Sequence, residues 1–362
     1  MKYAYNKISA IAAVVALSAA LAACGGGGGG GGAPATPATP SQPASAGNLQ
    51  TTVPAATYTS GTMQAETFKQ LNAFRSAMGV GLVAQNTTLD TSAQPHAFYL
   101  NTNIGTGALS GLTHNESSSL ANYYGDTPLS RAQKAGISVT DWIAEDVAGG
   151  IPQTDATAYA KDCLSRLLDT VYHLQDMTSS VEQVGIGFTQ NSGTYVDYTC
   201  VFDFAEVSNV VGAPQANAVY IYGGQQMATD AVAVAPLPNA TGVELAMVPE
   251  TTNPAPDLAN PGRPIMVRVN AASPGDVLTV SSFTLTAANG TVVPARIIVP
   301  SAALSGSTGA TADVNNKFYP GVAILLPLAP LAPNTTYTVA FSGARNGKAV
   351  SPKPWTWTTG AS

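Results

Sequence analysis

Apolar and polar positions follow two different patterns along the chain. Residues 63–79 carry apolar side chains three or four positions apart and end at a glycine, which is the spacing of a helix. Similar patterns predict further helices at residues 89–100, 127–136 and 154–173. Short apolar or alternating runs predict strands at residues 141–148, 183–189 and 195–204. The order of these elements predicts an α+β layered domain with a small antiparallel sheet over residues 60–207.

From residue 243 onward, short apolar runs alternate with turn residues. Asn-Gly pairs at 289–290 and 346–347 indicate hairpins, and about seven strands at this spacing predict a β-sandwich. The expected strands are residues 243–248, 265–269, 277–286, 292–299, 322–328, 336–343 and 354–360. The stretch LAPNTTYTVAFSG followed by WTWTTG resembles Ig-like modules of bacterial surface proteins, which implies a tyrosine-corner role for Tyr337, with core packing as the alternative. We assign residues 208–362 to a linker and this domain.

The N-terminus has the features of an export signal. Lys2 and Lys7 precede an apolar run over residues 8–23, which is short for a membrane span. The run ends in LAAC and resembles the bacterial lipobox, which implies a signal peptide over residues 1–24 and lipidation of Cys24; an ordinary signal peptide is the alternative. The glycine that follows the cysteine implies the outer membrane of the cell envelope. The Gly- and Pro-rich residues 25–59 are typical of a tether.

Charge and cysteine content narrow the classes of function. The net charge is -6 and basic residues form no patch, which argues against a nucleic-acid partner. Cys163 and Cys200 are the cysteines that remain beyond the signal region, and in an oxidising compartment they predict one disulfide, with two buried thiols as the alternative.

Charged residues make up only 10% of the chain, yet Glu145 and Asp146 stand side by side in the apolar stretch WIAEDVAGG (142–150). These two acids indicate either a solvated strand edge or a polar pocket. Strand alternation would direct their side chains to opposite faces of a sheet.

The motifs around this strand resemble the CAP superfamily, the cysteine-rich secretory, antigen and pathogenesis-related proteins. They run in family order as LNAFRSAMG, HAFYL, LTHNESSS, TPLSRAQKAGI, AEDVAGG and VYHLQDMTSSVEQVGIGF. The resemblance implies an α-β-α sandwich with a cleft of two histidines and acids, which holds a divalent metal such as zinc in some members. By position it nominates His114, Glu145 and His173 as metal ligands and places Glu145 in the cleft, whereas strand alternation would point Asp146 to the other face. His96 lies on an apolar helix face, which favours a packing role.

The chain also departs from the family pattern. Asp146 stands where an asparagine is usual, Leu167 where many members have tryptophan, and Tyr172 where glycine precedes the second histidine. The second cleft glutamate has no clear equivalent, and Asp169 is the acid closest to its position. These departures favour a narrower cleft with altered metal affinity.

Three functions fit these observations. The first is an envelope lipoprotein that binds a lipid or peptide in the cleft without turnover. The second is a zinc-dependent hydrolase or peptidase, in which His114 and His173 hold the metal and Glu145 is a ligand or general base. The third is an adhesive or structural protein that acts through the Ig-like module. A serine hydrolase is disfavoured because the chain lacks a Gly-x-Ser-x-Gly nucleophile elbow.

Overall fold

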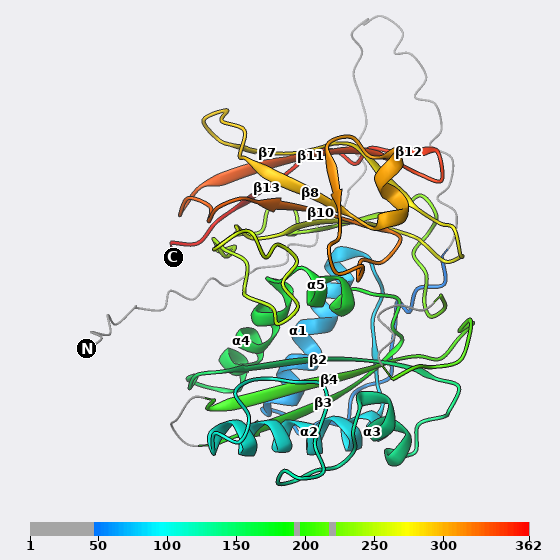
Figure 1. The fold of residues 1–362 in the computed structure, drawn as a ribbon, viewed down its shortest axis with the longest axis vertical. Helices are drawn as coiled ribbons and strands as arrows, with labels where there is room; N and C mark the ends of the chain where they lie inside the picture. Colours follow the sequence, from blue (N-terminus) through cyan, green and yellow to red (C-terminus); the bar gives the residue numbers. More distant parts are fainter. Residues whose placement is uncertain (1–46, 192–195, 217–221, 362) are drawn as a thin grey trace, which may run out of the picture. The chain divides into compact units, whose positions relative to one another are not determined.

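A computed structural model of the chain describes residues 47–191, 196–216 and 222–361 (Figure 1). The predicted signal peptide, Cys24 and most of the predicted tether therefore lie outside the described residues. The α/β region and the β-rich region that follows it belong to one unit, Ala44–Ser362. Within the described residues, no helix is long and apolar enough to cross a membrane.

The first region is an α-β-α arrangement around a sheet with the order β1-β3-β4-β2 (Figure 1). Its strands are β1 (Ala84–Gln85), β2 (Trp142–Gly150), β3 (Gln183–Gln190) and β4 (Tyr198–Glu206). The β2–β4 and β3–β4 pairs are antiparallel, whereas the short β1 runs parallel to β3. Helices α2 (Thr87–Gly105) and α3 (Pro128–Ala135) cover one face, and α1 (Met63–Met78), α4 (Ala156–Leu168) and α5 (Tyr172–Met177) cover the other.

Local sequence explains where most of these helices begin and end. The Thr62 hydroxyl accepts from the Ala65 amide at the start of α1, and Gly79 ends the helix with φ 76°. Thr127 and Ser130 form a capping box around the first turn of α3. The sequence pattern predicts one helix over residues 154–173, and this prediction is wrong. The chain breaks after Leu168 and resumes as α5, because a carboxylate from outside this region binds the first amides of α5.

Two further features hold the layers together. A Cβ atom on Gly185 of β3 would lie 2.1 Å from the Leu89 carbonyl carbon, so α2 can approach the sheet only because this residue is glycine. On the opposite face, the predicted disulfide between Cys163 and Cys200 is confirmed and joins α4 to β4.

The C-terminal region consists of two sheets that share one apolar core. One sheet has the order β5-β6-β10-β8-β9, and the other contains β12-β11-β13 with β7 paired to β11. Its elements are β5 (Val232–Ala235), β6 (Ile265–Val269), β7 (Leu278–Ala287), β8 (Ala295–Val299), η1 (Ser301–Gly306), β9 (Ala310–Ala312), β10 (Val322–Pro327), β11 (Thr336–Arg345), β12 (Lys348–Val350) and β13 (Trp355–Thr358). Side chains such as Val267, Val339 and Trp357 are buried between the sheets.

One expected strand of this region is wrong. Residues 243–248 make only isolated bridges, Val243 with Thr359 and Ala246 with Gly262, and otherwise continue as an irregular segment. That segment crosses to the α/β region, where the Val248 amide donates to the carbonyl of Asp169. Apolar side chains of α1 and α5 pack with those of β6, β8 and β10 in a further core cluster, so the two regions share a buried interface.

Candidate functional site

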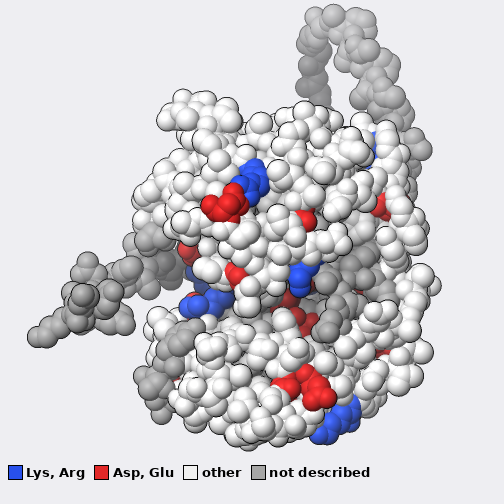
Figure 2. All heavy atoms as spheres, in the orientation of Figure 1, with Lys and Arg blue, Asp and Glu red and all other residues white. Residues whose placement is uncertain are grey.

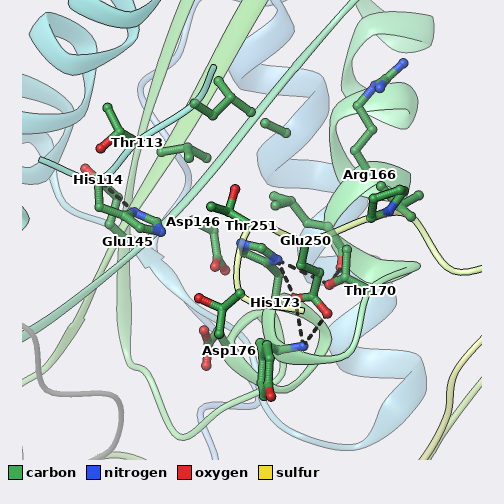
Figure 3. A pocket seen from close by; sticks show the side chains of 18 of the residues that line it. Thr113, His114, Glu145, Asp146, Arg166, Thr170, His173, Asp176, Glu250 and Thr251 are labelled. Carbon is green, nitrogen blue, oxygen red and sulfur yellow. Dashed lines mark hydrogen bonds and ion pairs between the residues drawn. The ribbon is translucent and has the colours of Figure 1, made fainter. Parts of the chain in front are cut away.

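A cavity of about 530 Å³ opens beside strand β2 (Figure 3). Its walls come from β2, from the 112–115 loop, from α4 and α5, and from residues 248–252 of the irregular segment, with Lys317 at one side. Charged side chains are sparse on the face shown in Figure 2, and acidic atoms are visible in the hollow across its middle. The cavity is therefore lined by both regions of the chain.

Glu145 lies at the centre of one charged group. Its Oε2 accepts from Arg131 Nη2 at 2.5 Å, and its Oε1 lies 2.9 Å from His114 Nδ1. The same Arg131 nitrogen donates to the His114 carbonyl at 3.0 Å, so one guanidinium holds both residues. Burial opposes ionisation of Glu145, but the charges of His96 and Arg131 and the His114 hydrogen bond outweigh it and hold the pKa of this carboxyl well below its usual range.

His96 supports this group from the apolar face of α2. The ring is buried, with Nδ1 2.9 Å from Glu116 Oε1 and Nε2 2.9 Å from the Thr113 carbonyl oxygen. Glu116 in turn accepts from the amides of Tyr124 and Gly125. Because both ring nitrogens are engaged in the interior, His96 fixes the loop that carries His114 and is not exposed to the cavity.

His173 forms a second histidine–carboxylate pair with Glu250, a residue that no sequence motif indicates. Its Nδ1 lies 3.0 Å from Oε2 of Glu250, which belongs to the irregular segment before β6 (Figure 3). Glu250 also accepts from the amides of Val171 at 2.7 Å and Tyr172 at 3.0 Å, and thereby caps α5. Burial alone would lower the pKa of His173, but the carboxylates of Glu250, Asp146 and Asp176 raise it to about 9.

Asp146 and Asp176 lie on the same side of the sheet as His173. Asp146 is fully buried, and neither of its oxygens has a hydrogen-bond partner among the described residues. Burial and the neighbouring Asp176 raise the pKa of Asp146 well above its usual range. Burial also raises the pKa of Asp176 to about 6, although Asp176 accepts a hydrogen bond from the Tyr319 hydroxyl.

The alternation expected for Glu145 and Asp146 agrees with these contacts, but it does not remove Asp146 from the cavity. Glu145 faces α2 and α3, whereas Asp146 faces α5. Strand β2 is the edge of its sheet, and the cavity borders both of its faces. Both acids consequently line the cavity, with Asp146 on the side of His173.

The three nominated ligands line one cavity but do not form one cluster. Glu145 contacts His114, and His173 contacts Glu250 instead of Glu145. Both oxygens of Glu145 are already bonded within the protein. Among the described residues, no three His, Cys, Asp or Glu side chains are grouped to hold a metal ion. We therefore derive no chemical step through zinc, and metal binding stays a prediction.

Few features of the sequence indicate that Glu250 or Asp176 belongs to the site. Glu250 is a single acid after a proline, two residues beyond the expected strand at residues 243–248. Asp176 lies three residues after His173, which is helical spacing for a shared face, and this was the one usable signal.

Comparison with known protein families gives a match within the α/β region. No curated protein matches the sequence at a significant level. Residues 68–204 match the family model CAP, described as the cysteine-rich secretory protein family. The match includes His114, Glu145 and His173 but ends before Glu250. The α/β region of this chain is therefore a CAP domain, and the partner of its second cleft histidine comes from outside that domain.

Proposed function

We propose that the cavity binds a short peptide or a similar polar ligand without turnover. The observation that carries this proposal is the composite wall, in which two histidine–carboxylate pairs from different parts of the chain line one cavity of about 530 Å³. A pocket of this size suits a small ligand. Its carboxylates, histidines and threonines favour a polar ligand over an acyl chain, so of the two expected ligand classes we retain the peptide.

The contacts of the catalytic candidates support binding over turnover. Glu145 is neutralised by Arg131 and His114, which leaves it a weak general base. The hydroxyl of Thr170 lies 3.3 Å from His173 Nδ1, but it donates to the Leu167 carbonyl at 2.7 Å. Neither arrangement supplies an activated nucleophile.

A zinc-dependent hydrolase remains the second candidate, for one specific reason. In each histidine–carboxylate pair the carboxylate holds Nδ1, as it does behind many metal-bound imidazoles. In that case His114 and His173 would be ligands through Nε2, and Glu145 and Glu250 would support them. Metal content of the purified protein, compared with His114→Ala and His173→Ala, separates this candidate from the first.

The setting of the domain is part of the same proposal. We infer that Cys24 carries a lipid anchor and that the protein lies in the bacterial envelope, tethered by the Gly- and Pro-rich segment. The β-rich region is proposed to be an Ig-like module, and the Ala332 amide that donates to the Tyr337 hydroxyl at 2.9 Å supports a tyrosine corner. An adhesive role through that module is the remaining alternative.

Retention of peptides tests the proposed function. The probe is a lysine-free tripeptide pool, half with free and half with acetylated amino termini, passed over the immobilised chain from residue 25 onward. Thr251→Trp would fill the mouth of the cavity, because Thr251 is an exposed residue of its wall. Thr291→Trp, on an exposed hairpin turn, is the matched control. We expect wild type and the control to retain peptides and Thr251→Trp to retain none; equal retention by all three, or by none, would overturn the proposal.

A further inference from the structure

The carboxylates of the cavity differ in the hydrogen-bond and ion-pair partners that the protein provides for them. Glu145 is paired with Arg131 and His114, and Glu250 with His173 and two backbone amides. Asp176 accepts from the Tyr319 hydroxyl. Asp146 is as deeply buried as any of them, yet both of its oxygens lack a partner among the described residues. A buried polar group left in this state costs free energy, so a partner from outside the protein is expected.

We propose that Asp146, with Asp176 beside it, receives an ammonium group of the bound ligand. This inference rests on the proposed function, because it names the part of a peptide that the cavity recognises. The carboxylate of Asp146 lies beside the His173 ring and close to Asp176 on α5 (Figure 3). Both acids line the cavity, so the site faces the space in which the ligand would lie.

An ammonium group fits this site better than a metal ion or a neutral donor. It offers three hydrogen-bond donors and no acceptor, and its charge relieves the repulsion between two neighbouring carboxylates. A metal ion needs several ligand atoms within a short radius, and the described residues contain no such group of three. A neutral donor would leave the mutual repulsion of Asp146 and Asp176 in place.

The family pattern offers a suitable variant, because the resemblance places a neutral asparagine at this position. Asp146→Asn keeps the size of the side chain and removes its charge. Asp230→Asn removes one negative charge from an exposed position outside the cavity and is the control. The readout is the ratio of free-amine to acetylated tripeptides retained from the same lysine-free pool, measured by mass spectrometry with and without EDTA.

We expect wild type and Asp230→Asn to prefer free-amine peptides by about tenfold, which is the scale of one charge-assisted hydrogen bond. Asp146→Asn is expected to lose this preference while it still retains acetylated peptides. Methylammonium should displace free-amine peptides from the wild type selectively, which tests the site even if Asp146→Asn fails to fold.

Other outcomes separate the two proposals. If wild type retains both halves of the pool equally, peptide binding stands and the ammonium site is overturned. A preference that is unchanged in Asp146→Asn, or that EDTA abolishes in the wild type, would also overturn it, the latter in favour of a metal at Asp146. If wild type retains neither half, the proposed function fails together with this inference.

Discussion

Removal of Glu250 should destabilise the whole unit, although the residue lies outside the CAP domain. The Glu250 side chain is 1% exposed and makes charge-assisted contacts with His173 and with the amides of Val171 and Tyr172. Breaking a buried ion pair by removing one partner costs about 3–5 kcal/mol, so Glu250→Ala is expected to lose that much unfolding free energy. Glu250→Gln keeps one carbonyl acceptor, and we expect it to lose about 1–3 kcal/mol.

Urea unfolding followed by tryptophan fluorescence measures these losses, because Trp142 lies in the CAP domain and Trp355 and Trp357 lie in the β-rich region. Asp257→Asn breaks an exposed ion pair with Arg296 in the same β-rich region and should change stability far less. If Glu250→Ala unfolds at the same urea concentration as Asp257→Asn, the reasoning on the composite cavity is refuted.

Three further predictions concern the scaffold. Replacing Cys163 and Cys200 by alanine should lower the unfolding free energy by about 4 kcal/mol, because their disulfide closes a loop with a sequence separation of 37. Urea unfolding measures this loss. As an internal control, reductant added to the wild type should lower its unfolding free energy by a similar amount. Gly185→Ala should lower the melting temperature in calorimetry because its Cβ would meet the backbone of α2, and an unchanged value would argue against the close approach. Burial raises the pKa of Glu206 to about 8, so the protonated carboxyl stabilises the fold below the ordinary value of 4.5, and that contribution is lost as the pH rises through about 8. The stability of Glu206→Gln, which cannot ionise, should therefore increase relative to that of the wild type as the pH rises from 4.5 to about 8. A stability difference that does not change with pH would contradict the prediction.

The CAP domain could be predicted from sequence because its signals are local and ordered. Helix ends such as Gly79 and the box of Thr127 and Ser130 depend on neighbouring residues alone. The motifs around His114 and Glu145 mark residues that the structure places in the wall of one cavity. The disulfide could be predicted from the number of cysteines and the expected oxidising compartment.

The rest of the site could not be predicted because it depends on contacts between distant segments. Glu250 meets Tyr172 across a sequence separation of 78, and no local pattern marks such a contact. The same contact breaks the expected long helix at Leu168, since it caps a new helix beyond that residue. The place of Asp146 in the cavity could not be predicted for another reason. Alternation predicts the face of the sheet on which Asp146 lies, but it does not predict that β2 is an edge strand with the cavity on both sides.

The histidines offer the most direct test of the central claim that His114 and His173 line one ligand-binding cavity. The chain has three histidines, so their ring signals can be followed by NMR without crowding while a retained tripeptide is added. The account predicts that the signals of His114 and His173 shift together with a common dissociation constant, while that of His96 changes little. Shifts confined to one of the two cavity histidines, or to neither, would contradict it.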